Sequence, residues 1–323
     1  HPVAVFSSSF HKMPSNQARV VILGTGGTIA GTAATAADGV GYDAAQLSVQ
    51  TLVAAVPALS EVPLECEQVA QIDSRHMSYA LWQLLAQRVA HHLARAEVAG
   101  VVITHGTDTL EETAYFLHRV LAPNKPVVLT AAMRPATALL ADGPQNLFDA
   151  VQTALAPGAR GVVVAMAGAV DHAADVRKRH SYRVDAFDSG EAGPIACIEE
   201  GRLRLLRDWP HGAALGLDGV AHDPATWPRV DLVTSHAGAD GAMVRAMAAT
   251  GTRGIVVAGT GNGTVHQDLE AALREVQAQG VRILRATRCA EGGVVGEAAG
   301  ALPSAGTLSP VKARIELLLE LLS

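Results

Sequence analysis

Two stretches of this 323-residue chain hold residue types that could do chemistry, and the first is LGTGGTIAG at residues 23–31. A loop of small residues lets a substrate approach the backbone closely and offers N–H groups to a developing oxyanion. Thr28 in this loop would act as a nucleophile if a base lay beside it. A lone threonine would more often cap the following helix. The loop therefore predicts either a reactive hydroxyl or a helix cap.

The second stretch is THGTDTLEET, which follows an apolar run. Thr107, Asp108 and Thr109 place hydroxyls around a carboxylate at the expected end of a strand, a combination that would bind an amine or relay a proton. A lysine brought beside them would complete a Lys–Thr pair of base and nucleophile. Thr109 and Glu112 have the spacing of a capping box. Glu111 and Glu112 are expected to be structural, because acids favour the N-terminal end of a helix.

The glycine loops do not match a nucleotide site, and no ligand set for a metal is visible. The dinucleotide fingerprint would need a third glycine where the first loop has Ile29 and where GTGNGT has Thr264. The three cysteines, Cys66, Cys197 and Cys289, lie far apart and outside any Cys/His cluster, which argues against a zinc site and a disulfide framework. We therefore expect no cofactor and no metal.

Composition argues against several classes of partner. The net charge is -6 and the pI is about 6.1, without a basic stripe, so nucleic-acid binding is not expected. The longest apolar runs are too short to span a bilayer, so no membrane segment is expected. Scattered cysteines in odd number suit a reducing compartment.

Short β-branched runs alternate with helical patterns. Strands are predicted at 20–24, 100–106, 125–132 and 161–168, and helices at 47–57 and 79–94. This alternation predicts an α/β fold with a parallel sheet covered by helices on both faces. Catalytic sites in such sheets lie at the carboxyl ends of the strands, which is where both threonine-bearing stretches fall.

The chain is predicted to form two α/β domains. Residues 19–206 form the larger N-terminal domain, with a mostly parallel sheet covered by helices. Residues 207–227, rich in Pro, Gly and Asp, are expected to be an interdomain linker. Residues 228–323 form a smaller C-terminal domain with a parallel sheet, built on three further predicted strands.

The two ends of the chain differ in character. Residues 1–18 are expected to be a tag or a disordered N-terminus, with residues 1–12 added and Met13 as the native start. A processed mature terminus is the alternative. At the other end, Ser309 is expected to cap a final helix with Pro310 at its first position.

TGGTIAG at 25–31 and HGTDTLEETAYFL at 105–117 resemble the two signature motifs of the bacterial-type L-asparaginases and glutaminase-asparaginases. The resemblance extends from Val20 to the C-terminus, and AGTGNGT at 258–264 and GTLSPVKAR at 306–314 also look like that family. It implies an amidohydrolase that converts L-asparagine to L-aspartate and ammonia. The implied course has two steps, in which a threonine attacks the amide, ammonia leaves and water cleaves the aspartyl ester.

The resemblance also implies roles for individual residues. Thr28 would be the nucleophile, with Tyr42 in a mobile lid over the site. The Thr–Asp–Lys group would comprise Thr107, Asp108 and Lys178. An alternative gives the nucleophile role to the Thr107–Lys178 pair. The substrate-binding residues would be Ser74 for the α-carboxylate, Asp108 for the α-ammonium, Thr107, the neighbouring Arg75, and Asn262 from the second domain.

Two departures from the family pattern concern the substrate and the assembly. Arg75 stands where a glutamine is usual, and it is expected to turn outward or towards the carboxylate. The family often takes a glutamate from a neighbouring subunit, and Glu291 and Glu297 are the candidates. The resemblance implies a homotetramer built as a dimer of dimers. The cysteines of the periplasmic members' disulfide are lacking, which favours the cytoplasm.

Other functions stay open beside L-asparaginase activity. The protein could be a glutaminase-asparaginase, because preference between asparagine and glutamine depends on about one methylene of pocket depth, worth about 1–3 kcal/mol. It could be an amidase on another amide, which Arg75 would favour if it binds a carboxylate. A non-catalytic amino-acid-binding protein would keep Ser74 and Asp108 without needing Thr28 and Lys178.

Overall fold

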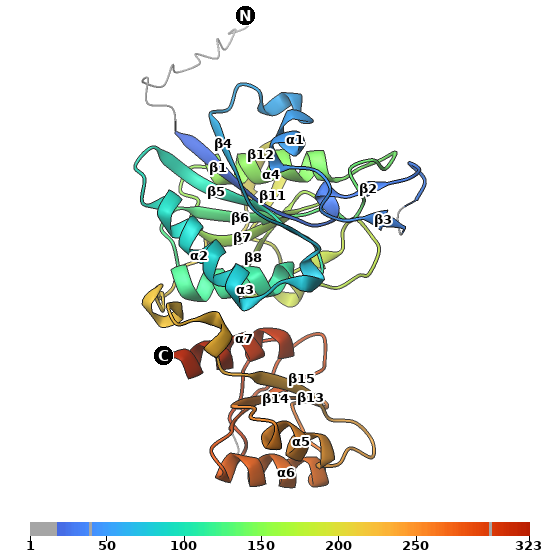
Figure 1. Cartoon of the computed structure of the whole chain (residues 1–323), viewed down its shortest axis with the longest axis vertical. Coiled ribbons are helices and arrows are strands. Elements are labelled where there is room, and N and C mark those ends of the chain that lie inside the picture. Colours follow the sequence, from blue (N-terminus) through green and yellow to red (C-terminus); the bar gives the residue numbers. More distant parts are fainter. Residues whose placement is uncertain (1–17, 39–40, 297–298) are drawn as a thin grey trace, which may run out of the picture.

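The structure is a computed structural model and describes residues 18–38, 41–296 and 299–323 (Figure 1). Its larger part is built on an eight-stranded sheet in the order β12-β11-β8-β7-β6-β5-β1-β4. The strands are β1 (Arg19–Gly26), β4 (Leu64–Ile72), β5 (Val98–Thr104), β6 (Pro126–Thr130), β7 (Gly161–Met166), β8 (Ala169–His172), β11 (Ala196–Glu199) and β12 (Arg202–Leu205). Strands β4, β1, β5, β6 and β7 are parallel, and β8, β11 and β12 continue the sheet antiparallel. The mostly parallel sheet is confirmed.

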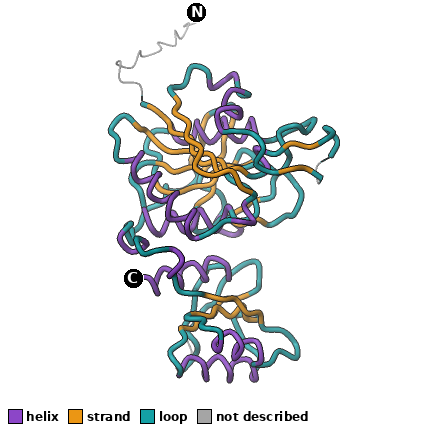
Figure 2. Tube along the Cα trace, in the orientation of Figure 1, coloured by secondary structure: helices purple, strands orange, loops and turns teal. Residues whose placement is uncertain are grey.

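Helices cover both faces of this sheet because its central strands are apolar at successive positions. In β1, Val21 and Leu23 pack with helices α2 (Tyr79–Leu93) and α3 (Leu110–Leu121). Val20 and Ile22 point to the opposite face and pack with α1 (Val49–Ala54) and α4 (Gly143–Leu155). The sheet therefore runs between two helical layers (Figure 2).

Two small ladders and several turns stand beside the large sheet. The ladders pair β2 (Thr32–Ala33) with β3 (Tyr42–Asp43) and β9 (Arg177–Lys178) with β10 (Phe187–Asp188). The 3-10 helices are η1 (Thr28–Ala30), η2 (Pro57–Leu59), η3 (Ser74–His76), η4 (Gly190–Ala192), η5 (Asp218–Val220) and η6 (Pro224–Thr226). The last two belong to the predicted linker, in which no strand or α-helix is found.

The smaller C-terminal part has a parallel sheet of three strands in the order β13 (Val230–Thr234), β14 (Gly254–Gly259) and β15 (Arg282–Thr287). Helices α5 (Ala242–Ala249) and α6 (Gln267–Ala278) cover one face. Helix α7 (Pro310–Leu322) lies between the other face and the larger part (Figure 1). Its start is as predicted, because the Ser309 side chain accepts from the Lys312 backbone N–H and Pro310 follows the cap.

Helix α7 also carries the polar contacts that join the two parts. The Glu316 carboxylate accepts from the Arg119 guanidinium at 2.7 Å and from the Tyr115 hydroxyl at 2.8 Å. Arg314 donates to Glu112 at 3.1 Å. Apolar residues of α7 pack in one buried cluster with residues of both sheets. The two parts are therefore joined by a hydrophobic core rather than by a solvated interface.

Two local expectations need correction or limits. The strand predicted at 161–168 ends at Met166, because β8 folds back from Ala169 to His172 as an antiparallel neighbour of β7. The expected tag or disordered terminus at 1–18 falls almost entirely outside the described residues. In the part of the chain that the structure describes, no helix has the length and apolar character to cross a membrane.

Candidate active site

The loops that follow β4, β1 and β5 pack against one another so closely that their contact positions leave no space for a Cβ atom. These strands are neighbours and parallel, so their carboxyl ends share one edge of the sheet. A Cβ on Gly27 would lie 2.4 Å from the Cα and N of Gly106, and a Cβ on Gly106 would lie 2.5 Å from the Ser74 hydroxyl oxygen. Glycine at both positions therefore lets Thr28, Thr107 and Ser74 gather at one place.

Gly27→Ala is expected to lower the free energy of unfolding by about 2–5 kcal/mol. The backbone at Gly27 has φ +82°, which strains a residue with a Cβ by about 1–2 kcal/mol, and the clash with Gly106 adds about 1–3 kcal/mol. Gly158→Ala is the matched control, because Gly158 has φ +74° and no atom within 4 Å of the added Cβ. Urea unfolding of both variants checks this, and equal losses would show that the close contact is unimportant.

The Thr28 hydroxyl lies beside a phenol. Thr28 is 6% exposed at the first position of η1, and the helix has Gly27 at its N-cap without a side-chain cap. The Thr28 Oγ1 and the Tyr42 hydroxyl oxygen are 2.6 Å apart. Of the two alternatives from the sequence, the helix cap is therefore excluded by geometry, and the hydroxyl is paired with a group that can exchange a proton with it.

Lys178 joins the second threonine-bearing stretch. The Lys178 ammonium donates to the Thr107 hydroxyl at 2.9 Å and to the Asp108 carboxylate at 2.8 Å. Lys178 lies on β9, which the chain reaches only after the β7–β8 hairpin, so these three side chains come from distant segments. Thr107 is 6% exposed, whereas the Asp108 side chain is 55% exposed and can reach a ligand.

Ser74 belongs to the same cluster, and Arg75 does not. The buried Ser74 hydroxyl accepts from the Asp108 backbone N–H at 3.2 Å. The Arg75 guanidinium pairs with Asp73 at 3.0 Å, and its side chain is 68% exposed, so it turns outward as one of the two expectations had it. The capping box at Thr109 is wrong, because the Thr109 hydroxyl donates to the Ser74 carbonyl at 2.9 Å instead.

Asn262 and Glu291 are not brought to the cluster within one chain. The Asn262 amide donates to the Val295 carbonyl at 2.8 Å and accepts from the Val295 N–H at 2.7 Å, in a turn after β14 of the C-terminal part. Glu291 forms an ion pair with Arg177. Glu297, the other candidate, lies outside the described residues.

His105 is near the cluster but serves the core. Its Nδ1–H donates to the Gly106 carbonyl at 2.7 Å, and its Nε2 lies 2.9 Å from the Thr113 hydroxyl. Burial lowers the pKa of His105 to about 4, so the ring is neutral near pH 7. Among the residues that the structure describes, no group of three or more His, Cys, Asp or Glu side chains could hold a metal ion.

The fold and the cluster together define a class of protein. It is a two-part α/β protein with a paired Thr–Tyr hydroxyl and a Thr–Asp–Lys group at the carboxyl edge of a parallel sheet, an arrangement suited to threonine-based nucleophilic chemistry. The chain belongs to the asparaginase family. The family model "Asparaginase, N-terminal" matches residues 19–211, and the model "Glutaminase/Asparaginase C-terminal domain" matches residues 229–323.

Individual relatives agree with this membership. The chain is 39% identical to a glutaminase-asparaginase of Pseudomonas fluorescens biotype A over 86% of its own length and 77% of the relative's. It is 35% identical to L-asparaginase 2 of Bacillus subtilis, over 93% and 81% of the two chains. It is also similar to the crystal structure of a probable cytoplasmic L-asparaginase from Campylobacter jejuni, with a TM-score of 0.89, 38% identity and coverage of 94% and 95%.

Proposed function

We propose that this protein is an L-asparaginase, an amidohydrolase that converts L-asparagine to L-aspartate and ammonia without a cofactor. The observation that supports it most is the placement of two proton-exchanging pairs at one sheet edge. Thr28 lies 2.6 Å from the Tyr42 hydroxyl, and Lys178 lies 2.9 Å from Thr107. Family membership and the names of the relatives favour the same reaction.

Thr28 is the proposed nucleophile. Its oxygen attacks the side-chain amide carbon of the substrate, and its proton passes by way of Tyr42 towards the departing ammonia. Backbone N–H groups of the glycine loop would stabilise the oxyanion, an effect typically worth about 3–4 kcal/mol. Water then attacks the aspartyl ester and frees the Thr28 hydroxyl. The Thr107–Lys178 pair is proposed as the base that activates this water once Lys178 has passed a proton to Asp108, and it remains the alternative nucleophile.

The substrate's α-groups are proposed to bind beside Ser74 and Asp108. The exposed Asp108 carboxylate suits the α-ammonium, and the Ser74 hydroxyl suits the α-carboxylate. Thr107 would complete the contacts. Arg75, which pairs with Asp73, is left outside the proposed contacts, and this favours a free amino acid over a substrate with an additional carboxylate.

Arg75→Gln is therefore expected to change kcat/KM for L-asparagine by less than about fivefold, because an exposed ion pair contributes at most about 1 kcal/mol. The measurement is steady-state ammonia release from wild type and variant. A loss of a hundredfold or more would instead place the guanidinium at the substrate.

We also propose that the site is completed by a second copy of the chain. Asn262 would reach the cluster from a neighbouring subunit, since within one chain its amide is bound to Val295. Leu139 and Leu140, 83% and 71% exposed, offer apolar surface of the kind that subunits bury. The proposed assembly is a homotetramer formed as a dimer of dimers, and light scattering on the purified protein tests it.

Two smaller proposals follow from the same membership. The domain boundaries proposed are 19–206 and 228–323, with 207–227 as the linker. A cytoplasmic location is proposed because Cys66, Cys197 and Cys289 are all free thiols, as suits a reducing compartment. Cell fractionation of the native host tests the location.

The deciding experiment measures ammonia release from L-asparagine and from L-glutamine by the purified protein. Release from asparagine with little from glutamine supports the proposal. Comparable release from both supports glutaminase-asparaginase activity, the second candidate, which the name of the Pseudomonas fluorescens relative favours. Release from neither amide contradicts both, and ligand binding without turnover would then indicate an amino-acid-binding protein.

A further inference from the structure

Lys312 is a buried lysine in the first turn of α7. Its side chain is 1% exposed, and its ammonium donates to the Ala174 carbonyl at 2.9 Å and to the Val176 carbonyl. Among the described residues, no carboxylate lies within 4.0 Å of it to form an ion pair. Buried lysines are rare unless paired, because removing an ammonium from water is costly, so this one calls for a reason.

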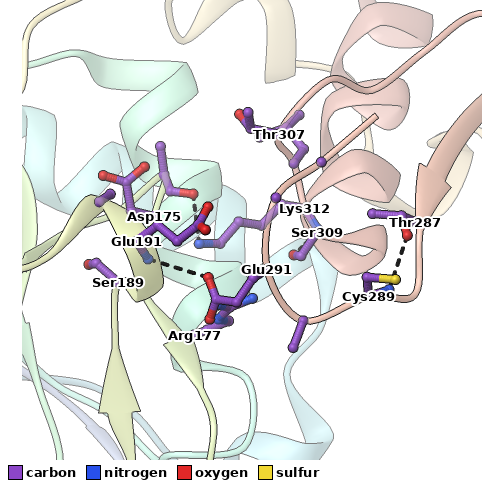
Figure 3. A pocket seen from close by; sticks show the side chains of 16 residues that line it. Asp175, Arg177, Ser189, Glu191, Thr287, Cys289, Glu291, Thr307, Ser309 and Lys312 are labelled. Carbon is purple, nitrogen blue, oxygen red and sulfur yellow. Dashed lines mark hydrogen bonds and ion pairs between the residues drawn. The ribbon is translucent and has the colours of Figure 1, made fainter. Parts of the chain in front are cut away.

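The two carbonyls belong to the segment that leads directly to Lys178. Strand β8 ends at His172 and β9 begins at Arg177, so residues 173–176 set where β9 starts. In Figure 3, Lys312 reaches from the C-terminal part across to the loop of the larger part that carries Asp175. The same side chain lines a cavity of about 240 Å³ between the two parts.

Lys312 also acts on the other segment of the cluster. Burial raises the pKa of Glu111, in the first turn of α3 just after Asp108, and the Lys312 charge opposes that rise. Burial lowers the pKa of Lys312 to about 8, while Glu111 and Asp175 oppose the fall, so the ammonium is still mostly charged at neutral pH. Lys312 therefore lies close to both segments whose ends hold Lys178 and Asp108.

We propose that Lys312 is a positioning residue for the hydrolysis. By fixing the carbonyls of Ala174 and Val176, its ammonium holds Lys178 within hydrogen-bond reach of Thr107 and Asp108. The C-terminal part thereby sets the geometry of a cluster made entirely of residues from the larger part. This inference rests on the proposed function.

Lys312→Met tests it, because methionine keeps most of the length and volume of the side chain and loses the donors. We expect kcat for L-asparagine to fall about tenfold or more with KM within about twofold, because the lysine acts on the reacting groups rather than on substrate binding. Lys312→Gln, which keeps an amide donor, is expected to lose less. A crystal structure of the methionine variant is expected to place the Lys178 nitrogen beyond 3.5 Å from the Thr107 oxygen.

Glu316→Gln is the matched control. Glu316 also lies on α7 and also joins it to the larger part, but its partners are Tyr115 and Arg119 on α3 and not the segment before Lys178. We expect kcat of the Glu316→Gln variant to stay within about twofold of wild type, whatever the effect of this substitution on the melting temperature.

Three results would overturn the inference. They are an unchanged kcat in folded Lys312→Met, equal falls of kcat in Lys312→Met and Glu316→Gln, or an undisturbed Lys178–Thr107 contact in the variant's crystal structure. If Lys312→Met fails to fold, Lys312→Leu, which also lacks donors, replaces it, and an unchanged kcat in that variant would overturn the inference as well. Wild type is assayed in parallel. Failure of wild type to release ammonia would reject the proposed function and this inference together, whereas an active wild type with unaffected variants rejects the inference alone.

Discussion

Thr28→Ala is expected to lower kcat for ammonia release from L-asparagine by roughly 10⁴-fold or more, as removal of a catalytic nucleophile does elsewhere. The variant loses the hydroxyl that lies 2.6 Å from Tyr42 together with the γ-methyl group, and it keeps the Cβ. Binding of asparagine through Ser74 and Asp108 is expected to persist. Ammonia release and ligand-induced thermal stabilisation, measured side by side, check both halves of the prediction.

Thr28→Ser is the control for this variant. Serine restores the hydroxyl, so a substantial part of the activity is expected to return. Rapid acid quenching followed by mass spectrometry of peptides identifies the attacking residue directly. An aspartyl adduct on the peptide with Thr28 supports the proposed order of events, while an adduct on the peptide with Thr107 would transfer the nucleophile role to the Thr107–Lys178 pair.

Lys178→Met is expected to lower kcat by about 10²–10⁴-fold, the range found for general acid–base groups. The variant leaves the Thr107 hydroxyl and the Asp108 carboxylate without the ammonium that bridges them. KM is expected to rise moderately, since Asp108 is also a proposed substrate contact and would be freer to move. Steady-state kinetics with L-asparagine separate the two parameters.

Lys125→Met supplies the comparison for Lys178→Met. Lys125 donates to the carbonyls of Leu93 and Arg95, so it too binds backbone oxygens, but it lies before β6 at the opposite end of that strand from the cluster. Its kcat is expected to be unaffected. Loss of activity in both variants would mean that general destabilisation, and not the chemistry at Lys178, explains the effect.

The sequence alone predicts those strands whose side chains are buried on both faces of the sheet. Strand β1 has an apolar run from Val20 to Leu23, and β7 has one from Val162 to Met166, because both faces of the sheet are covered. Such runs are recognisable without any tertiary information. The cap at Ser309 is equally local, since it requires only a hydroxyl before a proline and a helical pattern.

Strand β4 was not predicted because its sequence, LECEQVAQI, looks like a polar surface. Glu67 is tolerated there because it pairs with Arg88 and forms a hydrogen bond with the buried His92. Glu65 pairs with Arg95. Pairing of this kind depends on residues that lie twenty or more positions away in the sequence, since Arg88 follows Glu67 by 21 positions. The local sequence pattern therefore fails to predict a strand whose charged side chains are paired with residues far away in the sequence.

Lys312 shows the same limit within the candidate site. It stands three and seven positions before Ile315 and Leu319, which are both buried, so its spacing places it on the inner face of the helix. That pattern was the available signal, but the partners of the ammonium are backbone carbonyls, which no residue type reveals. The family motifs predict Thr28, Thr107 and Lys178 as site residues, whereas the Thr28–Tyr42 and Thr107–Lys178 contacts required the fold.

The position of β1 inside the large sheet has a consequence for how the protein is made. This strand leaves the ribosome before the other strands of the sheet, yet it lies between β4 and β5, and its residues from Val20 to Gly26 are buried. At a synthesis rate of about 5–20 residues per second, the roughly 70 residues between β1 and β5 take about 4–15 seconds to appear. During that interval an apolar strand has no second neighbour, which exposes the nascent chain to aggregation and chaperone capture. Pairing across such sequence distances is also slow, so recovery of activity should mark the last stage of folding.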